Sequence, residues 1–215
     1  MPEITNYMFA SGDWRTEELT AALPESLRDQ NVSMSHIDYT SEMYPLALEK
    51  VFSFMSSSAN GRYSDRTMMT IRRTADRWRD TTVSARYTYI NDELGSNPYL
   101  PYMFIVESPY SWDEETEIKR GGILGAMICL PNDEGEYRGV LAVAENVRQQ
   151  GIGKALLERQ QGWTGVINLY AHQSNMNAMR LAASVGMAAI QVNSSTGAVQ
   201  YGRCANPAAV RRRGM

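Results

Sequence analysis

The sequence is poor in cysteine and histidine, and each shortage excludes a class of protein. Two widely spaced cysteines, Cys129 and Cys204, do not form the framework of a disulfide-rich secreted protein. Two histidines, His36 and His172, are far from the spacing of a zinc site, so we expect no metal. The chain shows no basic region followed by an apolar signal, and no apolar run approaches the roughly 20 residues that cross a bilayer. We therefore expect a cytoplasmic protein without a membrane partner.

The chain has no large excess of positive or negative charge. Its formal net charge is only −3, which argues against bulk affinity for nucleic acid. Many of the cations lie in one arginine-rich stretch: Arg62, Arg66, Arg72, Arg73, Arg77, Arg79 and Arg86. These side chains fit a helix face in water, interleaved with aspartates, and they also fit a docking site for an anionic partner. The salt dependence of binding would separate the two interpretations.

A length of 215 residues suits one domain with an N-terminal extension. We assign residues 1–34 to the extension, residues 35–205 to the domain and residues 206–215 to a basic tail. The extension is polar, with one helical stretch expected around Thr16 to Leu27, and we expect it to lie outside the core.

Apolar periodicity predicts helices and strands along the domain. A short strand at residues 35–39 precedes helices that start near Ser41 and Ser64, and residues 83–90 alternate like a strand. Further strands are expected at 102–110, 123–130, 136–143, 165–171, 188–192 and 199–203, with a helix at 151–161. Because strands outnumber parallel crossovers, we expect an α/β fold with a mixed, mainly antiparallel central sheet flanked by helices.

The stretch Val140 to Leu157 is the most informative, because an apolar strand passes through a polar turn into a glycine-interrupted helix start. Gly151 and Gly153 lack Cβ atoms, so the backbone can approach a ligand closely. The amides from Gln149 to Lys154 would point outward at the positive end of the helix, where a diphosphate binds well. Arg148 adds a planar cation that can contact two phosphate oxygens.

Residue spacing separates three glycine-rich phosphate motifs. A Walker A loop needs a Gly at position 148 and a Ser or Thr at position 155, where the chain has Arg148 and Ala155. A dinucleotide fingerprint needs a third Gly where the chain has Leu156. What remains is the pattern Q/R-x-x-G-x-G/A over Arg148 to Gly153. It resembles the acetyl-CoA pyrophosphate loop of the GNAT (GCN5-related) N-acyltransferase family.

A second segment resembles the later GNAT helix, commonly written N-x-x-A-x-x-L-Y-x-x-x-G-F. Four residues match its pattern: Asn175, Ala178, Leu181 and Gly186. Met187 stands where the family usually has Phe, which is an exchange of one apolar residue for another. Ala182 replaces the tyrosine that in many members protonates the departing CoA thiolate, so the proton donor is in question.

The resemblance implies a GNAT-like three-layer fold and acetyl-CoA as the co-substrate. In this fold the strand before the loop and the strand after its helix splay apart, and the pantetheine arm lies between them against main-chain groups. The cofactor-binding residues that the resemblance implies are Leu141, Ala142, Val143, Arg148, Gln149, Gln150, Gly151, Ile152, Gly153, Lys154 and Asn175. The amine acceptor would enter from the opposite side.

Acyl transfer to an amine needs a free lone pair, yet an alkylamine of pKa near 10.4 is only about 0.1 per cent neutral at pH 7.4. The resemblance places the family's base positions at Tyr137 and Tyr170. Tyrosine is a poor base near neutrality, so a water chain ending at Glu136, Glu107 or His172 is an alternative. His172 also fits a loop histidine without chemistry.

Two functions therefore stand at this point. The first is an N-acetyltransferase that moves an acetyl group from acetyl-CoA to a primary amine on a small molecule or a protein, by direct transfer in a ternary complex. It would work mainly by holding amine and thioester together. The alternative is a catalytically silent GNAT-like module that binds CoA or another partner. A homodimer through the terminal hairpin is left open.

Overall fold

The computed structural model describes residues 16–39, 41–57, 63, 65–80, 101–113, 118–131, 137–164 and 167–203. The strands in these ranges are β1 (Ser33–Asp38), β2 (Tyr102–Asp113), β3 (Ile118–Pro131), β4 (Tyr137–Val143), β5 (Ile167–His172), β6 (Met187–Asn193) and β7 (Ala198–Arg203). The helices are α2 (Thr16–Thr20), α3 (Glu25–Arg28), α4 (Tyr44–Ser56), α5 (Asp65–Arg79), the short 3-10 helix η2 (Glu145–Val147), α7 (Ile152–Thr164) and α8 (Met176–Ser184). The strand expected at residues 83–90 lies outside the described residues.

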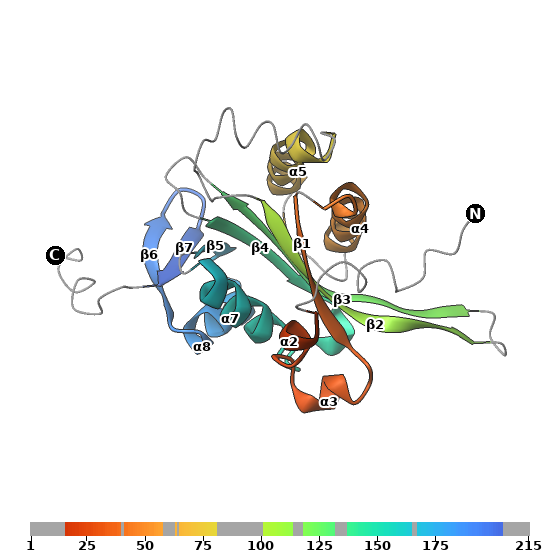
Figure 1. Ribbon diagram of the computed structural model, residues 1–215. Coiled ribbons are helices and arrows are strands. Elements are labelled where there is room, and N and C mark those ends of the chain that lie inside the picture. The colour runs from red at the N-terminus through yellow and green to blue at the C-terminus, as the bar shows by residue number, and fades with distance from the viewer. Residues whose placement is uncertain are drawn as a thin grey trace.

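The strands form one sheet that, over the described residues, has seven strands in the order β1-β2-β3-β4-β5-β7-β6 (Figure 1). The β4–β5 pair is parallel, whereas the other neighbouring pairs are antiparallel. Helices cover both sides of this sheet (Figure 1). The predicted mixed, mainly antiparallel sheet flanked by helices is therefore confirmed.

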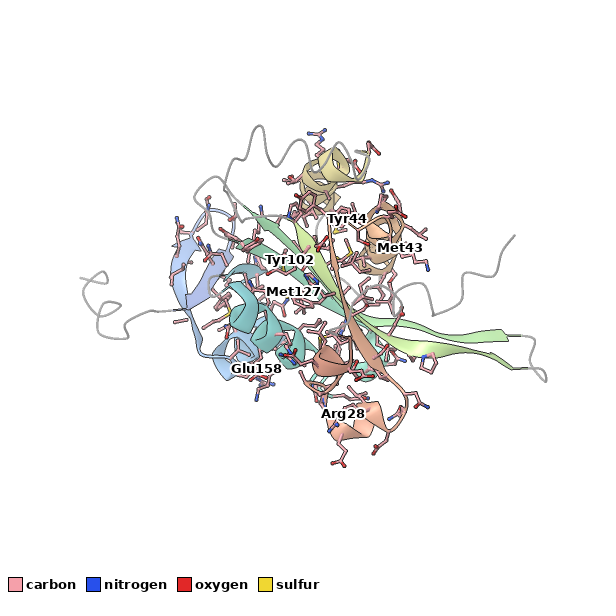
Figure 2. The ribbon with its side chains drawn as sticks, viewed as in Figure 1. Arg28, Met43, Tyr44, Tyr102, Met127 and Glu158 are labelled. Carbon is pink, nitrogen blue, oxygen red and sulfur yellow. The ribbon has the colours of Figure 1, made fainter. Side chains whose placement is uncertain are left out.

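The two faces of the sheet bury separate hydrophobic clusters. One cluster joins the sheet to α4 and α5 and includes Val140 and Ala142 of β4. The other joins it to α2, α3, α7 and α8 and includes Tyr137 of β4. Figure 2 shows Tyr102 and Met127, which belong to the second cluster, near the centre of the molecule, with Tyr44 on the side of α4. Successive residues of β4 thus face opposite layers, as the pleat of a strand requires.

The N-terminal segment differs from the prediction that it lies outside the core. Leu19, Leu23 and Leu27 are each no more than 2% exposed and belong to the same cluster as α7. Arg159 of α7 pairs with the Glu18 carboxylate at 3.2 Å and also donates to the Glu18 carbonyl. The leucines recur every fourth residue, so an apolar stripe is buried although the segment is polar on average.

The single helix expected around Thr16 to Leu27 is also divided in the structure. α2 ends at Thr20, and α3 begins after Pro24, which takes the N-cap position. Proline has no N–H to continue a helix, but it is tolerated where a new helix starts. The result is a compact corner of two short helices in front of β1, tied to it by the hydrogen bond from the Met34 amide to the Thr20 hydroxyl at 3.0 Å.

Within the ranges that the structure describes, no helix has the length and the apolar character that a membrane crossing needs. Within the same ranges no cluster of three or more His, Cys, Asp and Glu side chains is arranged to hold a metal ion.

Candidate active site

The turn between β4 and α7 has the backbone of an anion-binding loop. Gln149 and Gly151 adopt positive φ angles of 66° and 89°. The first helical hydrogen bond joins the Ala155 amide to the Gly151 carbonyl at 3.0 Å. The amides of the turn before it have no acceptor within the helix and lie at the positive end of its dipole. The side chains of Gln149, Gln150 and Lys154 are exposed at this turn, whereas Ile152 and Gly153 are buried.

The glycines of this loop also permit close packing. A Cβ on Gly153 would lie 3.1 Å from Leu181, and one on Gly151 would lie 2.8 Å from Pro24. On β3, a Cβ at Gly125 would lie 2.5 Å from Ile152, at the first turn of α7. The start of α7 is therefore held against the sheet, α8 and α3 at once, which fixes the direction of its amides.

Two cations flank the loop. The Arg148 guanidinium donates to the Val143 carbonyl at 3.3 Å and lies 3.8 Å from the Glu145 carboxylate. Lys154 is half-exposed and lies 3.7 Å from Glu158, one turn along α7. Arg148 is thus oriented by the end of β4, while Lys154 presents a mobile charge in water. Both arrangements keep positive charge beside the exposed amides.

The strands β4 and β5 part beside this loop. Among the described residues they pair at three positions: Tyr137 with Ile167, Arg138 with Asn168 and Gly139 with Leu169. β4 then continues to Val143 and β5 to His172. An opened sheet edge of this kind offers main-chain donors and acceptors to an extended ligand.

The direction of the main chain along β4 shows which groups face the opening. The Ala144 amide donates to Leu124 of β3 at 2.8 Å, so this amide points away from β5. Backbone groups alternate along a strand, so those of Leu141 and Val143 point toward β5 and those of Ala142 point toward β3. The contact of Arg148 with the Val143 carbonyl agrees with this alternation.

Tyr63 contacts the opened edge, and sequence reasoning did not find it. Its hydroxyl donates to the Leu141 carbonyl at 2.6 Å and accepts from the Leu141 amide at 2.9 Å. Burial raises the pKa of Tyr63 to about 12, against smaller lowering effects from the Leu141 hydrogen bond and the Arg138 charge. The residue lies between α4 and α5 with no motif around it, so nothing in the sequence marks it.

The two tyrosines at the family's base positions lie in different environments. Tyr170 is 41% exposed, and the Arg138 guanidinium lies 4.7 Å from the centre of its ring. Tyr137 is 3% exposed and packs in the core, with its ring centre 5.1 Å from that of Tyr102. The structure therefore brings Tyr170 together with Arg138 and leaves Tyr137 among core side chains.

His172 and Asn175 form local contacts at the carboxyl end of β5. The His172 Nδ1 atom accepts from the Ser174 amide at 3.2 Å and lies 2.7 Å from the Ser174 hydroxyl. The Asn175 side chain caps α8 by accepting from the Ala178 amide at 3.1 Å. Both side chains thus organise the turn into α8.

Of the other residues considered for proton transfer, Glu107 is buried and Glu136 lies outside the described residues. Burial raises the pKa of the Glu107 carboxyl, and the charge of Lys50 partly opposes this shift. Ala182, in the position of the missing tyrosine, is 1% exposed and packs in the core cluster of α7 and α8.

Residues 110–198 match the family model described as an acetyltransferase (GNAT) domain. The resemblance to the GNAT family is confirmed. The matched region runs from β2 to the start of β7, so it includes β4, the turn between β4 and α7, α7 itself and α8. The description of the domain supports acyl transfer as the class of activity.

Solved structures of acetyltransferases are similar to this chain at low identity. A PaiA N-acetyltransferase from Thermoplasma acidophilum in complex with coenzyme A is 13% identical, with a TM-score of 0.48, over 80% of this chain and 98% of that one. An IAA acetyltransferase from Bacillus cereus is 14% identical, with a TM-score of 0.45, over 80% and 98% of the two chains. The comparison with curated proteins gives no match.

Proposed function

We propose that this protein is an N-acetyltransferase that moves an acetyl group from acetyl-CoA to a primary amine by direct transfer in a ternary complex. One observation carries the proposal: the opened edge of β4 leads through a short turn into a helix start whose first amides have no acceptor within the helix. Acetyl-CoA joins an extended thioester arm to a diphosphate. The arm matches the opened edge of β4, and the diphosphate matches the helix start that follows it.

The diphosphate would bind at the amides from Gln149 to Lys154, beside the cations of Arg148 and Lys154. The residues present fit this group, because the positive φ angles of Gln149 and Gly151 turn successive amides outward and the side chains around them are exposed. The pantetheine arm would lie along β4, where Leu141 and Val143 turn main-chain groups toward β5. Ala142 turns its main chain toward β3 and buries its side chain in the cluster of α4 and α5, so we propose that it supports the edge of β4 without contacting the arm.

For the amine, we propose that it approaches on the face of α4 and α5, beside Tyr170. A cationic amine near Arg138 would lose its proton more readily, because a like charge disfavours the protonated form. Of the candidate bases, Tyr170 follows directly after the last residue of β5 that pairs with β4. Glu107 would act through water, since it belongs to the second strand from β4. Tyr137 and His172 would support the site through core packing and through the turn into α8.

Without a tyrosine at Ala182, the departing thiolate would take its proton from water. A thiolate with a pKa near 8.5 leaves easily at neutral pH, so little acid catalysis is needed. Most of the acceleration would then come from holding amine and thioester in contact.

The direct test measures binding and transfer separately. Isothermal titration with CoA and acetyl-CoA tests the cofactor site, and a free-thiol release assay over small amines, aminoglycosides and peptides tests transfer. Acetyl-CoA binding with amine-dependent thiol release supports the proposal. Binding without thiol release over the whole panel contradicts it.

The second candidate is a silent module with a GNAT fold. Ala182 in place of the tyrosine favours it, and so does the Tyr63 hydroxyl, which already satisfies the Leu141 main chain. This module would keep its partner when the loop glycine Gly151 is replaced, whereas the enzyme would lose its co-substrate.

A further inference from the structure

The Tyr63 hydroxyl is bonded to main-chain groups that a strand normally uses for pairing. It accepts from the Leu141 amide at 2.9 Å and donates to the carbonyl of the same residue at 2.6 Å. Gly139, two residues earlier and with the same backbone direction, is paired with Leu169 of β5. Leu141 is therefore the next residue of β4 whose main-chain groups point toward β5. The Tyr63 side chain occupies these groups in place of a paired strand.

We propose that Tyr63 is a catalytic residue that, together with the Leu141 amide, donates a hydrogen bond to the acyl oxygen of the bound thioester. This inference rests on the proposed transfer function. The acyl oxygen would replace the Tyr63 oxygen as the acceptor of the Leu141 amide. Tyr63, displaced by about one hydrogen-bond length, would turn its O–H from the Leu141 carbonyl to that acyl oxygen.

The chemistry of the step needs such donors. As the amine nitrogen bonds to the thioester carbon, the carbonyl electron pair moves onto the acyl oxygen. When that pair returns, the carbon–sulfur bond breaks, the thiolate leaves with its electrons, and the amine proton passes to water. Donors aimed at the oxygen stabilise the charge it carries between these two events.

The surroundings of Tyr63 suit a donor that keeps its proton. The ring packs against the core cluster of α4 and α5, which keeps the hydroxyl beside the β4 edge. Burial raises the pKa of Tyr63 to about 12, so the hydroxyl stays protonated near neutral pH. The same pKa makes Tyr63 unsuitable as a general base.

The test compares Tyr63→Phe with the wild type, with Tyr44→Phe as the matched control. Tyr44 is a buried tyrosine of α4 in the same core cluster, away from the β4 edge. We expect Tyr63→Phe to bind acetyl-CoA as tightly as the wild type or more tightly, because the competing hydroxyl is gone. We expect kcat to fall about 10²–10³-fold, as for loss of one such donor. The pH profile should keep its shape, and Tyr44→Phe should keep the wild-type kcat.

A second measurement does not depend on turnover. The infrared carbonyl stretch of ¹³C-labelled acetyl-CoA should lie at lower frequency when bound to the wild type than when bound to Tyr63→Phe. Equal frequencies, or an unchanged kcat, overturn the role of Tyr63 while leaving the transferase proposal intact. Failure of the wild type to bind acetyl-CoA overturns both. Binding with a shifted stretch but no transfer to any amine overturns the transferase proposal and the catalytic role of Tyr63, and leaves only its hydrogen bond to the acyl oxygen.

Discussion

The two edges of β4 differ, although they belong to one strand. Toward β3, β4 is paired from Tyr137 to Val143, and the strands on that side bury Phe104, Met127 and Ile128 completely. Toward β5, three pairs are followed by an opening that Tyr63 and Arg148 contact. The paired edge stabilises the fold, whereas the opened edge has main-chain groups outside strand pairing, where we propose that the co-substrate binds. Mutations on the two sides should therefore separate stability from binding.

The largest effect is expected on the paired side. Phe104→Ala removes a fully buried ring from β2 and should lower the free energy of unfolding by about 3–5 kcal/mol. Urea unfolding measures the loss, and Phe104→Leu, which leaves a smaller cavity, should cost less. Acetyl-CoA affinity, measured where the variant is folded, should stay near the wild-type value. A stability loss below about 1 kcal/mol would show that this side is not the source of stability.

The next effect concerns the loop beyond the opened edge. Gly151→Val should weaken acetyl-CoA binding at least about 100-fold, or about 2.8 kcal/mol, because the side chain strains a positive φ and meets Pro24. The matched control is Gly186→Val, since Gly186 has a similar φ of 75° and open space around it. Titration calorimetry compares them. Equal losses in both variants would mean that general backbone strain, and not the loop, controls binding.

A smaller effect is expected at the cap of α8. Asn175→Ala removes the acceptor of the Ala178 amide and should lower stability by about 1 kcal/mol. Asn175→Ser keeps a capping oxygen and should recover most of that loss. The acetyl-CoA dissociation constant should stay within about twofold in both variants, which calorimetry can resolve. A tenfold weakening in both would instead make Asn175 a cofactor ligand, as the family resemblance implies.

The smallest effect is expected on the arginine-rich face. Arg72 is half-exposed and pairs with Glu49 at 3.1 Å, so Arg72→Gln should cost at most about 0.5–1 kcal/mol, less at high salt. Thermal unfolding at low and high salt measures this. If Arg72→Gln also weakened acetyl-CoA binding in a salt-dependent way, this face would be a docking site for an anion.

Sequence patterns predicted most elements because their signals are local. The helix α4 follows from apolar residues spaced along one face, and the hairpin of β2 and β3 follows from two apolar runs. The loop before α7 was predicted from Gly151 and Gly153 because glycine freedom and helix-start amides depend on neighbouring residues. The burial of Leu19 was missed because its partners are supplied by α7, far along the chain.

The contact of Tyr63 with Leu141 could not be predicted in the same way. The two residues are 78 positions apart, and the contact joins a side chain to main-chain atoms that carry no sequence signature. The contact is possible because pairing between β4 and β5 ends after Gly139. Where two strands stop pairing depends on the packing of the whole fold. The loop proposed to bind the diphosphate is therefore readable from sequence, whereas the contact proposed for the acyl group requires the fold.

The packing of the first two helices against α7 has a practical consequence for work with shortened versions of this protein. The region that a family model detects, residues 110–198, is smaller than the unit that buries its apolar surface. An expression fragment beginning at residue 35 would leave a hydrophobic hollow where Leu19, Leu23 and Leu27 now sit, and would remove Pro24 from its place beside the loop. We expect such a fragment to aggregate. An affinity tag should therefore be added before residue 16 and should not replace the two helices that follow it.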